Sequence, residues 1–225
     1  MDYTEVMKEL NDLVDPRYKN SESQIGDQAG ERLGIGVTKL KKLAKKIKKN
    51  HELALQLWDT PLFECKLLSA FIEDPKQVTK EQIESQIPNS RGFMLADYFS
   101  EFVIVKTKFS DELIEKWTQS PEDPIKKAGF ALLYCKAKAD KKASDDFFMP
   151  YLEQIEKEIQ SAENWVKESM NYAICHIGSR SKELNEYCLG LAARIGEVEI
   201  DYGTTSCVTV DATNWLKSDR IQKKL

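Results

Sequence analysis

Glycine and proline are scarce in this sequence, and long apolar runs are missing. Its 225 residues include 10 Gly and 7 Pro, too few for the many tight turns of a β-sandwich. No apolar run approaches the roughly 20 residues that a membrane-spanning helix needs. The first 13 residues are acidic and lack the basic and apolar regions of a signal peptide. We therefore expect a helical, cytoplasmic protein without membrane contact.

Cysteine and histidine are also sparse. The five cysteines are scattered without a C-x-x-C pair, and His51 and His176 lie far apart. A disulfide framework, a zinc cluster and histidine-centred catalysis are therefore not expected, and four of the cysteines should be small buried hydrophobes. A P-loop, a G-x-G-x-x-G motif and an H-E-x-x-H motif are missing too. We predict no metal and no cofactor.

Most of the sequence has the residue pattern of amphipathic helices. Apolar residues at helical spacing predict helices over residues 2–14, 37–47, 51–58 and 63–72, the second of them capped by Thr38. More helices follow to about residue 195, with breaks near Pro88, Pro121 and Gly178. Beyond Gly196 the pattern is less regular. We expect one last helical turn over residues 211–216 and a frayed end over residues 217–225.

A degenerate repeat runs through this helical pattern. Three times a short helix ends near a Trp or Pro and a longer helix opens with a lysine, namely Lys66, Lys127 and Lys167. A helix pair repeating at roughly 35–45 residues is typical of HEAT-like solenoids, whose stacked pairs leave a concave groove. The sequence therefore predicts an all-α, HEAT-like helical repeat solenoid, curved and forming one domain over residues 1–225. The three lysines should line one side of its groove.

A dense group of lysines occupies the helix predicted over residues 37–47 and its end. The net charge of −4 counts against a protein that coats nucleic acid, but it allows one basic face. No acidic residue interrupts the group, so its like charges repel, and a bound polyanion would offset that repulsion. A solvated helix face is the alternative. The group consists of Lys39, Lys41, Lys42, Lys45, Lys46, Lys48 and Lys49.

A single carboxylate, Asp97, interrupts the apolar stretch over residues 93–99. Phe93 lies four residues earlier, so its ring and the carboxylate share one helix face. An aromatic ring beside an acid is suited to a cationic group. A surface or capping aspartate is the alternative that this spacing leaves open.

Residues 34–47 (GIGVTKLKKLAKKI) and 55–70 resemble the DNA alkylation repair proteins, the HEAT-like repeat alkylpurine DNA glycosylases, and weaker similarity continues to about Arg194. The resemblance implies a Trp-x-x-x-Asp that supplies a ring and the catalytic carboxylate. It also implies an Arg on a later helix and a second Trp further on. Here Asp97 stands at the acid position, whereas Phe93, Lys127 and Tyr172 replace the Trp, the Arg and the second Trp.

The activity implied by the resemblance is hydrolysis of the N-glycosidic bond of cationic alkylated purines in double-stranded DNA. Asp97 would stabilise positive charge on the deoxyribose and position a water, and Phe93 and Tyr172 would add aromatic faces. Lys127 would hold a phosphate without the bidentate fork of arginine. Each exchange is expected to cost about 1 kcal/mol, several-fold in rate.

Three functions stay open from the sequence. A glycosylase would use Asp97 for catalysis, and a non-catalytic relative would bind damaged or branched DNA through the same groove. A protein-binding scaffold is the third, favoured by the acidic overall charge. In either DNA-binding case a monomer would hold the DNA backbone with Lys39, Lys42, Lys45, Lys46, Lys49, Lys66 and Lys167.

Overall fold

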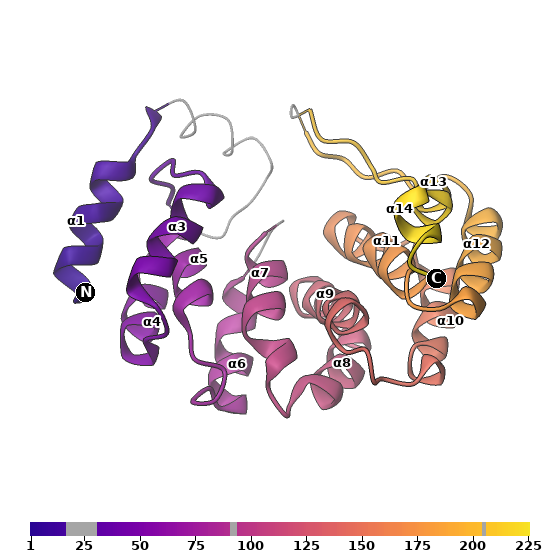
Figure 1. The fold of residues 1–225 in the computed structure, drawn as a ribbon, viewed down its shortest axis with the longest axis horizontal. Helices are drawn as coiled ribbons and strands as arrows, with labels where there is room; N and C mark the ends of the chain where they lie inside the picture. Colours follow the sequence, from indigo (N-terminus) through magenta and orange to yellow (C-terminus); the bar gives the residue numbers. More distant parts are fainter. Residues whose placement is uncertain (17–30, 91–93, 204–205) are drawn as a thin grey trace. The chain divides into compact units, whose positions relative to one another are not determined.

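The computed structural model describes residues 1–16, 31–90, 94–203 and 206–225 (Figure 1). Within these ranges the regular structure is helical, and one isolated bridge joins Glu31 and Leu62. The chain divides into two compact units, an N-terminal unit over Met1–Phe109 and a C-terminal unit over Ser110–Tyr202 and Ser206–Leu225. None of the described helices is long and apolar enough to cross a membrane.

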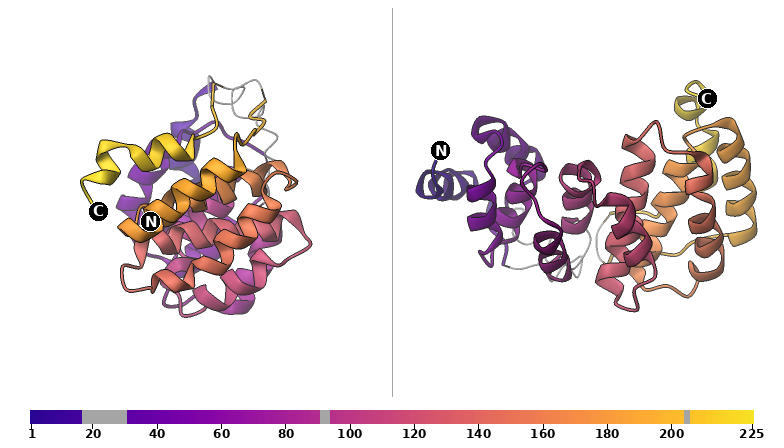
Figure 2. Two further views of the ribbon diagram at one scale, coloured as in Figure 1. Left: turned by 90° about the vertical axis from the view of Figure 1, so that its right-hand side faces the viewer. Right: turned by 90° about the horizontal axis from the view of Figure 1, so that it is seen from below.

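The N-terminal unit is a row of helices packed side by side (Figures 1 and 2). Within it α5 is central and packs against α3, α4 and α7. Its apolar face is buried because α5 has neighbours on several sides, which is why almost every residue of α5 is apolar or small. The helices are α1 (Tyr3–Leu13), α3 (Val37–Ile47), α4 (His51–Trp58), α5 (Phe63–Ile72), α6 (Lys80–Gln86) and α7 (Leu95–Phe102).

The helices predicted over residues 51–58 and 63–72 are confirmed to the residue, and the helix predicted from the apolar stripe over residues 37–47 is confirmed as α3. The predicted cap of α3 is wrong, because Gly36 occupies the N-cap position and Thr38 already lies inside the first turn. No side chain of the described residues caps this helix. Instead, a buried carboxylate binds the backbone of the residues that precede it. Glu64 on α5 accepts hydrogen bonds from the backbone amides of Leu33, Gly34 and Ile35 at 2.9, 2.7 and 3.1 Å.

These three bonds satisfy amides that the interior would otherwise leave unpaired, and they attach the start of α3 to α5. Glu64 itself is fully buried, and it lies in the first turn of α5, where the helix dipole favours a negative charge. The position of α3 relative to α5 is therefore fixed at its N-terminal end.

The C-terminal unit is built around one long helix, α9, which packs against α8 on one side and α11 on the other. Gly129 permits the contact between α8 and α9, because a Cβ atom there would lie 2.6 Å from the backbone nitrogen of Thr118. The predicted breaks at Pro121 and Gly178 fall between these helices, as expected. The helices are α8 (Ser110–Thr118), α9 (Asp123–Ala139), α10 (Met149–Glu158), α11 (Asn164–Ile177), α12 (Lys182–Ile195), α13 (Ala212–Lys217) and α14 (Asp219–Gln222).

The tail beyond Gly196 is extended and then helical again (Figure 1). Asn171 on α11 donates to the carbonyl of Val210 at 2.7 Å, which holds the returning chain against the unit. The predicted last turn is confirmed as α13. The predicted frayed end is wrong, because α14 follows and its Ile221 is 3% exposed. Gln222 also donates to the carbonyl of Leu216 at 2.7 Å, and the guanidinium of Arg220 lies 4.5 Å from the ring centroid of Trp215, contacts that the polarity of residues 217–225 does not reveal.

Candidate nucleic-acid interface

The lysines of α3 point in two directions, so they do not form one surface. Lys39 donates to the carbonyl of Leu13 at 3.2 Å, and Lys46 forms an ion pair with Glu9 at 3.1 Å. Both of these lysines therefore contact α1, although the side chain of Lys46 stays exposed. The exposed pair formed by Lys46 contributes little to stability.

A second set of lysines, spaced three or four residues apart, surrounds a pocket of about 450 Å³ between α3, α5 and α7. Helical geometry brings such residues onto one face. The floor is apolar, made of Ala44, Phe71 and Phe102. We call the surrounding side chains the lysine face, which consists of Lys41, Lys45, Lys48 and Lys49.

An aromatic cluster lies beneath Lys41. The ammonium nitrogen is 4.8 Å from the ring centroid of Tyr98, 5.5 Å from that of Phe71 and 5.3 Å from that of Phe102. The two phenylalanine rings meet edge to face with centroids 4.8 Å apart. Cation–π attraction over three rings holds Lys41 in place. Burial raises the pKa of Tyr98, so its hydroxyl group stays neutral.

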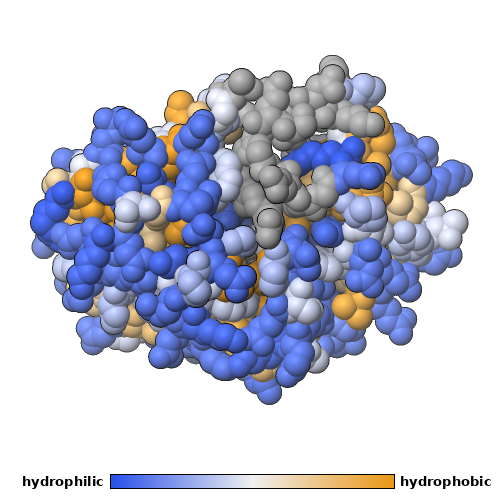
Figure 3. All heavy atoms as spheres, turned by 180° about the vertical axis from the view of Figure 1, so that it is seen from behind, coloured by the Kyte–Doolittle hydropathy of each residue, from blue (hydrophilic) through white to orange (hydrophobic). Residues whose placement is uncertain are grey.

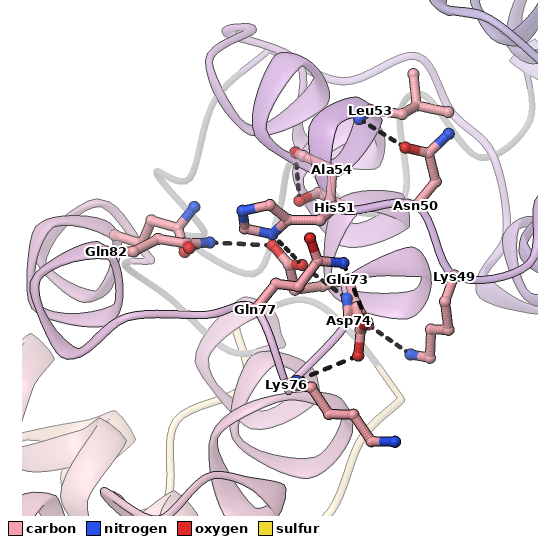
Figure 4. Close-up of polar contacts among 12 residues, drawn as sticks. Lys49, Asn50, His51, Leu53, Ala54, Glu73, Asp74, Lys76, Gln77 and Gln82 are labelled. Atoms are coloured by element: carbon pink, nitrogen blue, oxygen red, sulfur yellow. Dashed lines mark hydrogen bonds and ion pairs between the residues drawn. The ribbon is translucent and has the colours of Figure 1, made fainter.

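Lys49 is anchored at the end of α5 (Figure 4). Its ammonium group donates to the carbonyl oxygens of Phe71 at 3.2 Å and Glu73 at 2.7 Å. A cation is favourable there, because the last carbonyls of a helix are unpaired and the dipole is negative. Burial, and next the charge of Lys106, lower the pKa of Lys49.

The side chain of Glu73 connects the end of α5, where Lys49 is anchored, to two other helices. It is buried and accepts from Nδ1 of His51 on α4 at 2.7 Å and from Nε2 of Gln82 on α6 at 3.0 Å (Figure 4). This network fixes the turn between α3 and α4 against the end of α5. On the side of Lys49, the pocket is therefore bounded by this hydrogen-bonded network.

Lys48 has an unusual backbone conformation, with φ 67° and ψ −160°. It is the one non-glycine residue with a positive φ among those that the structure describes. Glycine adopts this region freely, whereas a residue with a side chain is strained there by about 1–3 kcal/mol. The chain thus carries an ammonium group at a position where the backbone favours glycine. The C-cap of α12, Gly196, has nearly the same conformation, with φ 77° and ψ −153°, but there the residue is a glycine.

Asp97 lies in the first turn of α7 and is partly exposed. A carboxylate at this end of a helix is stabilised by the dipole. Phe93, the predicted partner of Asp97, lies outside the described residues. Lys66 is partly exposed on α5, and it is not among the residues that line the pocket.

Tyr172 is part of a row of aromatic rings in the C-terminal unit. Its ring centroid is 5.9 Å from that of Tyr134 on α9, and Tyr134 stacks on His176 with centroids 5.5 Å apart at an angle of 26°. Trp215 on α13 continues the row, 5.4 Å from His176. Tyr134 and Trp215 were not predicted, because their proximity to Tyr172 depends on how α9, α11 and α13 pack. Lys167, on the same helix as Tyr172, is partly exposed.

Lys127 is 2% exposed on α9, and the sequence offered no sign of this burial. A phosphate ligand has to present its charge to solvent, so the predicted phosphate contact does not follow from the position of Lys127. The predicted residues therefore divide between the units. Asp97, Lys66 and the lysines of α3 belong to the N-terminal unit, and the C-terminal unit holds Lys127, Lys167 and Tyr172.

The packed helix pairs define the class of this chain as an all-α, HEAT-like repeat protein. A solved structure with a TM-score of 0.86 and 23% identity matches 100% of this chain and 96% of its own. It comes from a family described as related to the HEAT-like repeat DNA glycosylases with affinity for branched DNA structures. The predicted fold class is thereby confirmed.

The family follows from the sequence match. Residues 6–190 fit the model of the DNA alkylation repair enzymes, and the chain belongs to that family. The uncharacterized protein Lin0241 of Listeria innocua is 29% identical over 191 residues, 83% of each chain. The uncharacterized protein Lmo0209 of Listeria monocytogenes is 26% identical over 194 residues, 85% of this chain and 84% of its own.

Proposed function

We propose that the protein binds branched DNA through the lysine face of its N-terminal unit. The observation that carries this proposal is the convergence of four lysines on one pocket between α3, α5 and α7. The four residues bring positive charge to one pocket, and a phosphate bound there would offset the repulsion between like charges. The net charge of the chain is −4, so these four lysines stand out against an acidic overall composition.

The family and a structural relative support this choice of ligand. The chain is a member of the DNA alkylation repair enzymes, and the structural relative belongs to a family with affinity for branched DNA. At 23% identity that likeness supports the fold. The ligand is therefore proposed for this chain because the lysine face supplies a site that suits DNA.

Base excision is a second candidate function, and Asp97 favours it. Its carboxylate stands at the acid position of the family and is partly exposed, as a group acting on a deoxyribose must be. Two other observations weigh against excision. Lys127 is buried, and Tyr172 is engaged with Tyr134. DNA binding without excision is therefore our first choice.

A protein-binding scaffold has less support. Among the described residues the large exposed apolar side chains are few, those at the two ends of α1 are only 37–41% exposed, and the face drawn in Figure 3 is mostly hydrophilic. Stable protein partners generally need a continuous apolar patch. The large exposed apolar residues are Met1, Tyr3, Val14 and Val208.

Fluorescence anisotropy with a four-way junction, a three-way junction and a linear duplex of matched sequence tests the proposal. We expect tighter binding to the junctions, and Lys45→Glu should weaken it. Lys46→Gln, which removes a charge of the same helix on the side of α1, is the matched control and should change affinity far less. Equal affinity for junction and duplex, or equal effects of the two variants, would overturn the proposal.

Release of 7-methylguanine from methylated duplex DNA tests the second candidate. Our account expects no release above the level without protein. Release that disappears in Asp97→Asn would establish excision and assign the catalytic role to this carboxylate.

A further inference from the structure

The pocket of the lysine face has a feature that binding to duplex phosphates does not require. Exposed cations alone suffice to contact a phosphate backbone. Here the cations surround a floor made of Ala44 and the rings of Phe71 and Phe102. An apolar, aromatic floor under ammonium groups suits a ligand that is aromatic at one end and anionic at the other.

We infer that this pocket takes one unpaired nucleotide of a DNA branch, with its base against the ring of Phe102, the partly exposed phenylalanine of the floor, and its phosphate among the lysines. This inference rests on the proposed function and names the part of the branched DNA that the N-terminal unit recognises. Proteins that bind single strands combine a positively charged groove with aromatic side chains that stack on bases. In a duplex the bases are paired and cannot reach such a floor.

The size and the chemistry of the pocket fit this occupant. Its volume is about 450 Å³, within the range usual for sites that bind small molecules. Phe102 lies with Lys41 5.3 Å from its ring centroid and Lys106 also at 5.3 Å. A base that stacks on Phe102 therefore takes the place of one of these ammonium groups over the ring, and the displaced lysine is then close to the phosphate of the same nucleotide.

The cations differ in how firmly they are held, which assigns them different roles. Lys49 is fixed by the carbonyl oxygens of Phe71 and Glu73, so it contributes a charge at a constant position. Lys45 and Lys48 are exposed, and they are the groups that can close on a phosphate. The positive φ of Lys48 sets the direction in which its side chain leaves the end of α3.

Two DNA ligands and one pair of matched variants test the inference. The ligands are a fork with an unpaired arm and a blunt duplex of the same sequence, and 2-aminopurine in the arm reports base stacking by its quenching. Phe102→Leu keeps an apolar side chain but removes the ring. Phe109→Leu is the control, because Phe109 is also partly exposed and also has a lysine, Lys108, 5.3 Å from its ring centroid.

We expect Phe102→Leu to weaken binding to the fork by about five-fold or more, with unchanged affinity for the duplex and less quenching. Phe109→Leu should change none of these. Because Phe102→Leu also alters packing, the double variant Lys45→Glu/Lys48→Glu provides a second route on exposed residues. It should reduce the quenching of 2-aminopurine as well.

The outcomes separate this inference from the proposed function. Unchanged quenching in both variants, or an equal loss of affinity for fork and duplex, would overturn the nucleotide pocket while leaving branched-DNA binding in place. Wild-type protein that binds neither ligand would instead overturn the proposed function.

Discussion

Replacement of Lys48 by glycine should make the protein more stable and a weaker DNA binder at the same time. Most substitutions in a binding site change both properties in unrelated ways. At Lys48 the two effects have opposite signs for separate reasons, because the backbone favours glycine whereas the pocket needs the charge.

The size of the stability gain follows from the backbone. A side chain at φ 67° and ψ −160° costs about 1–3 kcal/mol, and glycine removes this strain. Glycine also gives the unfolded chain more conformational freedom, which lowers the free energy of unfolding by about 0.5–1 kcal/mol. The net gain is about 0–2.5 kcal/mol, which raises the melting temperature by up to roughly 10 °C for a chain of this length.

The loss of DNA affinity is measured by its salt dependence. If Lys48 contacts one phosphate, the slope of log Kobs against log salt becomes shallower by about 0.9. Differential scanning calorimetry and anisotropy titrations at several salt concentrations measure the two effects on one preparation. A lower melting temperature would refute the argument from strain, and an unchanged slope would refute the role of Lys48 in the lysine face.

Three further predictions concern other parts of the chain. Cys207 is exposed, whereas burial raises the pKa of Cys175 and Cys188 to about 12; mass spectrometry after brief iodoacetamide treatment at pH 8 should therefore find Cys207 labelled and those two thiols unmodified. Gly129→Ala should lower the free energy of unfolding by about 1–3 kcal/mol in urea titrations, because its Cβ would lie 2.6 Å from backbone of α8; an unchanged midpoint would contradict this packing. Burial lowers the pKa of Lys49, and a bound phosphate raises this pKa again, so DNA binding takes up protons. The affinity for DNA should therefore fall as the pH rises through the lowered pKa of Lys49. Lys49→Arg should abolish this pH dependence.

The helices were predictable because they depend on local patterns. Apolar spacing located α4 and α5 to the residue and α3 apart from its first turn, and the same pattern gave the repeat. The N-cap of α3 was not predictable in this way. It depends on a hydrogen-bonded carboxylate, Glu64, that follows α3 by more than ten residues in the sequence and orders the preceding loop.

The lysine face was predictable in part. The charges are visible in the sequence, and helical spacing alone separates Lys41, Lys45 and Lys48 from their neighbours. Which of the two sides is open depends on where α1 packs, and a local pattern does not contain that information. The aromatic floor was missed for the same reason, since Phe71 and Phe102 belong to different helices and meet only after α5 and α7 pack together.

The burial of Lys127 could not be predicted from the repeat pattern. Its place near the start of a longer helix resembles that of Lys66 and Lys167, yet these two are partly exposed and Lys127 is enclosed. The number of neighbouring helices does not explain this difference, because α5 and α11 also pack against several helices. Equivalent positions in a degenerate repeat therefore do not have equivalent access to solvent.

The most direct test of the lysine face is the salt dependence of junction binding in wild-type protein and in Lys45→Glu/Lys48→Glu. Our account predicts a steep loss of affinity with salt for the wild type, and a slope that is shallower by about 2 in the double variant. The same slope and the same affinity in both proteins would contradict it.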